Sequence, residues 1–360
     1  MRPLRVGILG ATGMVGQQFM AILHDHPWFR LTRLAASRRS AGQTYAKAVA
    51  GRWTQAIPVP AAVADMAVEE VGPPAGWEGE VDLVFAALAM DKERTGALEE
   101  AYARREIPVV SANSAHRWTP DVPMIIPEVN PQHLEVIASQ RRRLGVRRGF
   151  VAVKPNCSIQ PYVPALEPLR EFGPKRLSVC TYQAVSGAGR TLADWPEMED
   201  NIIPFIGGEE DKSRREPLRI WGHVEQDRIE PATGPLISIQ CVRVPVSHGH
   251  LAAVAVDFER RPEPEEILQR WESFRGRPQI LGLPSAPEPL LRYCPAEDRP
   301  QTRLDRDAAR GMAVVLGRLR PDELFDYQFI ALSHNVARGA AGGAVLTAEL
   351  LVAEGYLEVA

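Results

Sequence analysis

Two short motifs in this chain contain residue types that could carry out chemistry. The first is the glycine-rich run from Gly10 to Gly16 (GATGMVG), and the second is Asn156-Cys157-Ser158, which follows an apolar run. A glycine-rich turn between a strand and a helix lets the backbone approach a pyrophosphate, whose charge meets the N–H groups of the helix start. A cysteine thiolate can form a thioester, and a bound dinucleotide could deliver hydride to it. The two motifs together predict an enzyme.

The glycine-rich run favours a dinucleotide site over a structural turn because of its context. Gly10, Gly13 and Gly16 follow an apolar strand pattern and precede a helical pattern. At the end of the second strand pattern stands Ser37-Arg38-Arg39-Ser40. An acidic residue there would bind the ribose 2′-OH of NAD and repel a 2′-phosphate, whereas two guanidiniums and two hydroxyls suit that phosphate. The segment predicts NADP as the cofactor, and a merely solvated basic turn is the alternative.

Cys157 lies where the apolar run 150–153 stops and a helical pattern over 159–169 begins. A helix N-terminus lowers the pKa of a thiol, and its N–H groups can form part of an oxyanion hole. Pro164 cannot lie inside a regular helix, so the helix must begin close to it. Taken alone, Cys157 is as compatible with a buried structural cysteine as with a nucleophile.

Further polar residues stand at the ends of two strand patterns. Gln183 precedes a loop of small residues, where its amide could orient a bound acyl group. Arg243, His248 and His250 share a second strand and its end, and strict alternation would place both histidines on one face, opposite Arg243. A turn at Gly249 would change that arrangement. The spacing alone does not choose the catalytic imidazole.

The composition describes an ordinary globular protein without a general affinity for nucleic acid. The 360 residues suit two domains, and 45% hydrophobic and 24% charged residues with a formal charge of -3 give no field that would attract nucleic acid. The basic stretch 141–148 is typical of a solvated helix end, with an anion-binding surface as the alternative.

The cysteines indicate a reducing compartment. Cys157, Cys180, Cys241 and Cys294 lie far apart without a CxxC pair, which predicts neither a metal site nor a disulfide framework. A strand pattern follows Met1 almost at once, and no apolar run reaches membrane-spanning length. We therefore expect a cytoplasmic protein that does not span a membrane.

The order of the predicted elements indicates an α/β protein of two domains. Residues 1–155 alternate apolar runs with amphipathic stretches, which predicts a parallel, Rossmann-like sheet covered by helices. From about Lys175 longer strand patterns predict an α+β catalytic and dimerisation domain with a mixed sheet. The expected division is an NADP-binding domain over 1–156, completed by a C-terminal helix over 336–360, and a catalytic and dimerisation domain over 157–335.

In these motifs and their order, the chain resembles the aspartate-semialdehyde dehydrogenase family, specifically its archaeal and fungal branch. The resemblance runs nearly from end to end. The blocks that carry it are GATGMVG at 10–16, SRRSAG at 37–42, SANSAHR at 111–117, IPEVN at 126–130, NCSIQ at 156–160, QAVSGAG at 183–189, GEEDK at 208–212, RVPVSHGH at 243–250 and NVARGAAGGAVLTAEL at 335–350.

The resemblance implies a role for each matching residue. Cys157 would be the nucleophile, His250 the general acid/base, and Gln183 the residue that positions the acyl group. Arg243 would bind the substrate α-carboxylate and Glu209 its α-amino group, with a surface ion pair as the alternative for Glu209. Arg117, Lys212 and Asn113 would hold the leaving phosphate. The cofactor would contact Gly10, Thr12, Gly13, Met14, Val15, Ser37, Arg38, Arg39, Ser40, Ser186, Gly187 and, at its nicotinamide end, Asn335.

The implied reaction is the reversible, NADPH-dependent reductive dephosphorylation of L-4-aspartyl phosphate to L-aspartate 4-semialdehyde. It belongs to the biosynthesis of lysine, through diaminopimelate, and of threonine, methionine and isoleucine. Members of the family form homodimers, often paired into homotetramers, through the second domain. This implies a small-molecule substrate, phosphate and further copies of the chain as partners, with no nucleic acid and no membrane.

Two positions depart from the family pattern, and several other functions remain as alternatives. His248 stands where the family has an aspartate or another small residue, and Leu88-Ala89-Met90 replaces a proline-serine step. A malonyl-CoA reductase would use the same cysteine and NADPH, but it has no α-amino group for Glu209 to bind. An N-acetyl-glutamyl-phosphate reductase matches these motifs less well. A non-catalytic nucleotide sensor would not need Cys157, and a cysteine hydrolase would leave the dinucleotide loop unexplained.

Overall fold

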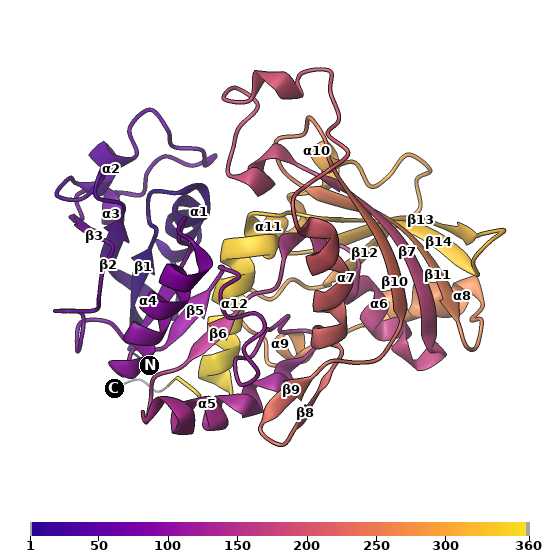
Figure 1. Cartoon of the computed structure of the whole chain (residues 1–360). Helices are drawn as coiled ribbons and strands as arrows, with labels where there is room; N and C mark the ends of the chain where they lie inside the picture. Colours follow the sequence, from indigo (N-terminus) through magenta and orange to yellow (C-terminus); the bar gives the residue numbers. More distant parts are fainter. Residues whose placement is uncertain (1, 358–360) are drawn as a thin grey trace.

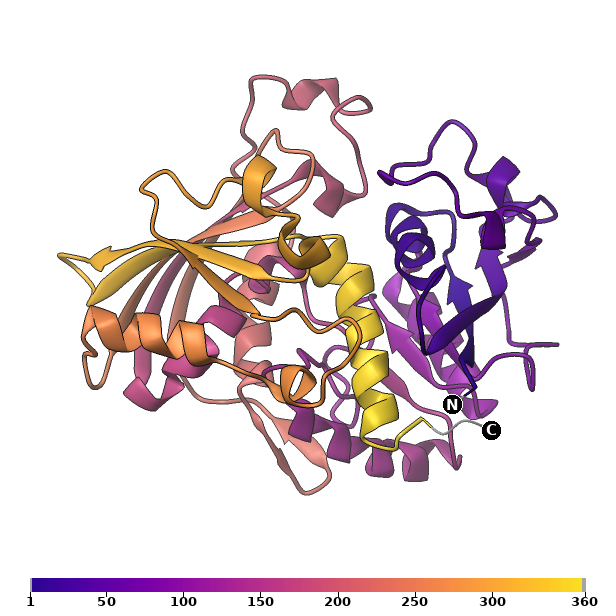
Figure 2. The same cartoon turned by 180° about the vertical axis from the view of Figure 1, so that it is seen from behind.

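A computed structural model describes residues 2–357 and shows two sheets with a long helix between them (Figures 1 and 2). Met1 and residues 358–360, which the predicted domain ranges include, lie outside the described residues. The first sheet is built by the N-terminal part of the chain and the second by the C-terminal part. The predicted α/β class with a Rossmann-like domain and a mixed-sheet domain is confirmed.

The first sheet is parallel throughout, in the strand order β3-β2-β1-β4-β5-β6. Its chain order reverses beside β1, which is where α/β sheets bind nucleotides. The strands are β1 (Leu4–Leu9), β2 (Phe29–Ala36), β3 (Val68–Glu70), β4 (Leu83–Ala86), β5 (Val109–Ser111) and β6 (Val151–Val153). The helices around it are α1 (Met14–Leu23), α2 (Tyr45–Ala48), α3 (Ala61–Ala64), α4 (Lys92–Arg104) and α5 (Ile137–Leu144).

The second sheet is mixed, in the order β10-β7-β11-β14-β13-β12. Its central strands pair antiparallel, and a parallel pair closes each side. The strands are β7 (Pro174–Gln183), β10 (Leu236–Arg243), β11 (His250–Phe258), β12 (Leu291–Cys294), β13 (Val314–Pro321) and β14 (Tyr327–Ser333), and β8 (His223–Glu225) pairs with β9 (Arg228–Glu230) as a separate hairpin. The α-helices of this part are α6 (Val163–Leu166), α7 (Glu209–Ile220), α8 (Pro264–Ser273), α9 (Arg277–Ile280), α10 (Thr302–Asp305) and α11 (Ala308–Gly311).

One face of the second sheet is buried and the other is open. Along β7, Leu177 and Val179 are buried while Arg176, Ser178 and Tyr182 are exposed, as the alternation of a strand requires. Helix α8 lies on the buried face, where Trp271 makes an edge contact with the ring of Phe329 at 5.2 Å between centroids. The open face is therefore free to meet another molecule.

The C-terminal helix α12 (Gly342–Ala353) lies between the two sheets in both views (Figures 1 and 2). Every residue from Gly342 to Leu351 is buried, and its apolar side chains join the same core as β1, β2 and α1. This segment, which was predicted to pack back onto the first domain, thus shares a core with it. Because both domains cover this helix, it is buried on all sides and is not amphipathic.

Among residues 2–357 no helix is long and apolar enough to cross a membrane. The same residues contain no cluster of histidine, cysteine and acidic side chains that could hold a metal ion.

Candidate active site

The glycine-rich turn joins β1 to α1 and needs two of its glycines for packing. Gly10 has φ +91°, and a Cβ there would lie 2.1 Å from the carbonyl oxygen of Ala87. A Cβ on Gly16 would lie 2.2 Å from the carbonyl oxygen of Gly10. These contacts hold the turn against β4 and against itself, so any larger residue would force the turn open.

Gly13 has a different role, because it faces open space. A Cβ there would meet only the Gly10 carbonyl oxygen, at 3.6 Å, and Gly13 is the N-cap of α1. The N–H groups of Met14 and Val15 lie in the first turn of that helix, where N–H groups have no partner within the helix. The turn therefore fits a pyrophosphate in the way that a dinucleotide-binding loop requires.

The predicted 2′-phosphate segment lies beside this turn. Ser37, Arg38 and Arg39 are exposed directly after β2, whereas Ser40 is buried with its hydroxyl 3.5 Å from that of Thr12. Arg52, which the sequence analysis did not single out, donates to the Ser40 hydroxyl at 3.1 Å. Exposed guanidiniums next to a phosphate-binding turn fit NADP.

Cys157 lies after β6 in a single 3₁₀ turn (Cys157–Ile159), and the regular helix α6 begins only at Val163, with Pro164 in its first turn. The expectation of a lowered thiol pKa is wrong for this structure. Burial and the nearby Glu209 carboxylate raise the pKa of Cys157 to about 11, against the opposing effect of neighbouring cations. A short 3₁₀ turn supplies too little dipole to overcome that desolvation.

His250 is the histidine whose imidazole ring lies next to the Cys157 thiol. Its Nε2 lies 3.4 Å from Cys157 Sγ, while its Nδ1 accepts a hydrogen bond from the Ala184 N–H at 3.1 Å. This partner assigns the ring proton to Nε2, so the neutral ring donates toward the sulfur. Burial, together with Arg243, lowers the pKa of His250 to about 3, and the ring is neutral at physiological pH.

His248 is directed elsewhere. Gly249 has φ +97°, which ends the strand alternation and separates the two histidines. His248 stacks on His334 with 5.3 Å between the ring centroids. The turn that the sequence left open is present, and it decides which histidine reaches the thiol.

Gly187 lies against the two most important polar side chains of the site. A Cβ there would be 2.8 Å from Arg243 Nη1 and 3.0 Å from both Cε1 and Nε2 of His250. Arg243 itself is buried and donates to the Ala184 carbonyl oxygen at 2.7 Å. No larger side chain could occupy position 187 without displacing Arg243 or His250.

Glu209, in the first turn of α7, connects two other predicted residues and Asn156, the neighbour of Cys157. Its carboxylate accepts from Lys212 Nζ at 2.9 Å, from the side-chain amide of Asn156 at 2.8 Å, and from Gln183 Nε2 at 3.5 Å. Burial opposes the charge, but Lys212, Asn156 and the facing His250 hold the pKa of Glu209 below its ordinary value. The carboxylate is charged and ready to accept from an ammonium group.

Arg117 and Asn113, which were predicted to bind phosphate, have different surroundings in the structure. Arg117 is buried, pairs with Glu216 Oε1 at 2.9 Å and donates to the carbonyl oxygen of Lys154 at 3.0 Å. The other oxygen of Glu216 accepts from the Asn156 N–H at 2.6 Å, so Arg117 adjoins the Cys157 turn. Asn113, by contrast, uses both atoms of its side-chain amide on the backbone of Leu88.

Asn335, which was predicted to contact the nicotinamide end of the cofactor, is hydrogen-bonded to Ser186 and Gly249. Its side chain donates to the Ser186 hydroxyl at 2.9 Å and accepts from the Gly249 N–H at 2.8 Å. Ser186, Gly187 and Asn335 thus meet beside His250, as the predicted site requires.

Two residues of the site were not found from the sequence. Glu216 lies two helical turns after Glu209 on α7, and this spacing could have indicated a shared face. Lys154 is a buried lysine at the end of β6, three residues before Cys157, and a single lysine after an apolar run gives no recognisable pattern.

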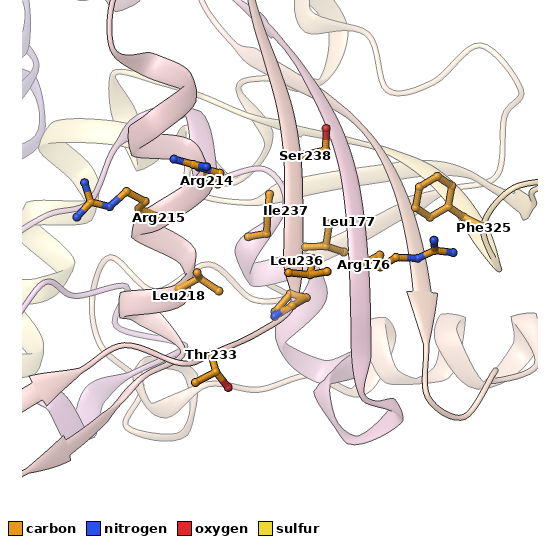
Figure 3. Close-up of a pocket in the computed structure, with 11 residues that line it drawn as sticks. Arg176, Leu177, Arg214, Arg215, Leu218, Thr233, Leu236, Ile237, Ser238 and Phe325 are labelled. Atoms are coloured by element: carbon orange, nitrogen blue, oxygen red, sulfur yellow. The ribbon is translucent and has the colours of Figure 1, made fainter.

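A groove of about 470 Å³ lies between α7 and the strands β7 and β10 and is not part of this site (Figure 3). Arg214 and Arg215 of α7, Leu236 and Ile237 of the edge strand β10, and Phe325 line it. None of the predicted site residues borders it. The predicted reaction is therefore assigned to the side chains around Cys157 and not to this groove.

Comparisons with known proteins agree with this geometry. The model "Semialdehyde dehydrogenase, NAD binding domain" matches residues 5–137, and "Semialdehyde dehydrogenase, dimerisation domain" matches residues 166–338. The aspartate-semialdehyde dehydrogenase of Methanothermobacter thermautotrophicus is 44% identical over 97% of this chain and 99% of its own length. That of Aspergillus fumigatus is 40% identical over 98% of both chains.

A solved structure shares the whole fold. The crystal structure of aspartate-semialdehyde dehydrogenase with NADP from Candida albicans is similar with a TM-score of 0.87 and 37% identity. The match covers 98% of this chain and 99% of that one.

Proposed function

Because the chain belongs to the aspartate-semialdehyde dehydrogenase family, we propose that it catalyses the NADPH-dependent reductive dephosphorylation of L-4-aspartyl phosphate to L-aspartate 4-semialdehyde, and the reverse reaction. This places the protein in the biosynthesis of lysine, threonine, methionine and isoleucine. The observation that carries the proposal is the 3.4 Å approach of His250 Nε2 to Cys157 Sγ, beside both Arg243 and Glu209.

The charges around the thiol suit an amino-acid substrate. Arg243 has no carboxylate partner among the described residues, so its guanidinium can take the α-carboxylate in a bidentate pair. The Glu209 carboxylate suits the α-amino group. Lys212 and Arg117 supply positive charge for the phosphate, and Arg117 keeps its pair with Glu216 as a support.

The turn at Gly13, the exposed Ser37 to Arg39 segment and Asn335 would hold NADP. When bound, NADPH supplies the hydride that reduces an acyl thioester to the level of the aldehyde. The chain's own residues do the rest of the work, which is to form the thioester, orient it and release it.

Cys157 first loses its S–H proton, and the thiolate then attacks the acyl carbon; the C–O bond to phosphate breaks, and inorganic phosphate leaves with that electron pair. Gln183, fixed by Thr181 and Glu209, orients the acyl group. The Nε2–H of His250 faces the reacting carbon and stabilises the charge that develops on its oxygen. When the C–S bond breaks, the aldehyde leaves and the sulfur returns to its place beside His250.

The test measures absorbance at 340 nm with L-aspartate semialdehyde, phosphate and either NADP or NAD. Phosphate-dependent reduction of NADP is expected, and malonyl-CoA with NADPH serves as a parallel assay. Cys157→Ala should lose turnover but still bind NADPH by fluorescence titration. Turnover that persists in Cys157→Ala, or oxidation of NADPH by malonyl-CoA without any aspartate-semialdehyde activity, would refute the assignment.

A homodimer is the expected assembly, with the open face of the second sheet as its contact surface. Exposed Tyr182 and Leu236 lie on or beside that face, and the matching family model is described as a dimerisation domain. Pairing of dimers into tetramers and a cytoplasmic location remain predictions, the latter favoured by four free cysteines.

A further inference from the structure

Lys154 is a buried cation that the reaction described above does not use. It follows β6, is 3% exposed, and its ammonium group has neither a hydrogen bond nor an ion pair with any residue in the described range 2–357. A lysine rarely lies so deep without a partner, because desolvation of the charge is costly. An unpaired lysine of this kind requires an explanation.

Lys154 and Cys157 lie on one face of the C-terminal helix. A Cβ on Gly339 would lie 2.8 Å from Cys157 Cβ, and a Cβ on Gly343 would lie 2.3 Å from Lys154 Cε and 3.2 Å from its Nζ. Gly339 and Gly343 are four residues apart in one continuous helical segment. The two side chains therefore pack against neighbouring parts of that segment.

The cavity that Lys154 lines is too small for a ligand. The cavity that it lines with Glu128, Gln160, Arg338 and Gly343 has a volume of about 10 Å³. A phosphate or a carboxylate does not fit there, since about this volume is needed for a single water molecule. The ammonium group therefore acts on its protein neighbours.

The other cations of the region are already engaged. Arg117 is paired with Glu216, and Arg338 forms two hydrogen bonds with Glu128, at 2.9 and 3.0 Å. Of these three cations, only Lys154 has no anionic partner among the described residues.

The remaining charged groups at the thiol are assigned to the substrate. Arg243 faces its carboxylate, and Glu209, held by Lys212, faces its amino group. His250 contacts the sulfur but is neutral and adds no net charge. With substrate bound, Lys154 is the remaining positive charge that can balance a thiolate.

We propose that Lys154 is the counter-charge of the Cys157 thiolate, a positioning residue that acts through the cysteine. The proposal rests on the proposed function of Cys157 as the nucleophile. In the reactive form the S–H proton of Cys157 has left and the Lys154 amine carries a proton, so the pair holds one proton in total. In the resting form the same single proton is on the sulfur and the amine is neutral.

The protonation of Lys154 gives this pair a distinctive pH dependence. Burial, with Arg338 and Arg117, lowers the pKa of Lys154 to about 7, while Cys157 and Glu128 oppose the shift. Above that pH the pair holds one proton, and the share of the reactive form no longer changes until the thiol itself titrates. Reactivity of Cys157 should therefore rise through about pH 7 and then level off.

The experiment measures the rate at which iodoacetamide alkylates Cys157 between about pH 6 and pH 10, followed on the Cys157 peptide by mass spectrometry. Lys154→Met keeps the length of the side chain and removes its charge, and Lys154→Gln is a second, polar replacement. Lys175→Met, at an exposed lysine, is the matched control. Thermal unfolding and NADP binding verify that each variant is folded.

We expect both Lys154 variants to lose the step near pH 7 and to alkylate about 10- to 100-fold more slowly at pH 8, because loss of a nearby positive charge raises the pKa of a thiol by about one to two units. Lys175→Met should follow the parent. A folded Lys154 variant whose profile superimposes on that of the parent would overturn the proposal. The alkylation assay uses no substrate, so its result does not depend on whether the protein turns over aspartate semialdehyde.

Discussion

Replacing Gly187 by alanine tests whether the site depends on the packing between its loops. The added Cβ would lie 2.8 Å from Arg243 Nη1 and 3.0 Å from His250 Cε1 and Nε2, whereas such atoms normally pack at about 3.5–4.0 Å. Each side chain must then move by about 0.5–1 Å. A shift of that size at a reacting centre costs about 10²-fold in rate, or about 2.7 kcal/mol of activation free energy.

The assay compares kcat/KM for phosphate-dependent NADP reduction in Gly187→Ala and the parent. Gly207→Ala is the matched control, because a Cβ there meets no atom within 4 Å and its φ is not left-handed. We expect Gly187→Ala to lose activity about 100-fold while its thermal midpoint changes little. A kcat/KM within about threefold of the parent would show that His250 and Arg243 do not depend on this contact.

Three further variants test the cofactor site and the buried charges. The double variant Arg38→Ala/Arg39→Ala should weaken NADP binding about 10-fold or more and leave NAD binding unchanged, as measured by fluorescence titration, because only NADP has a 2′-phosphate. Burial raises the pKa of Glu99 to about 7 from 4.5, so the folded state binds more protons between those values and the free energy of unfolding falls by up to about 3 kcal/mol as pH rises through them. Glu99→Gln should remove this slope in urea unfolding at pH 5.5 and pH 8, and an unchanged slope would assign it to other groups. Glu128→Gln leaves the buried Arg338 guanidinium without its carboxylate and should cost about 3–5 kcal/mol in urea unfolding, whereas a loss below about 1 kcal/mol would contradict this view of the pair.

Periodicity was sufficient to predict many of the regular elements, although α7 and β12 were not among them. The run Leu4 to Leu9, the helix after it and the long strands of the second sheet all lie where alternation or helical spacing places them. These elements follow local rules, since each buries one face or both faces of a short segment. The order of the strands around β1 follows from the alternation of strands and helices.

The site could be predicted as a set of residues but not as a geometry. Which histidine reaches Cys157 depends on the left-handed conformation of Gly249. The sequence around a glycine does not show whether the glycine adopts that conformation. The direction of the thiol pKa depends on Glu209 and on burial, both of which come from segments distant in sequence. Lys154 was missed for the same reason, because its isolation is a property of the packed interior.

The position of α12 means that the order in which this protein is synthesised differs from the order in which it can fold. The helix is made after all the strands of both sheets, yet its buried side chains belong to the core of the sheet that is made first. On the ribosome, the N-terminal half must wait, with part of its apolar surface uncovered, until Gly342 to Ala353 have emerged. A transcript that ends before Gly342 would encode all the strands of both sheets and still yield a polypeptide that cannot close its first domain.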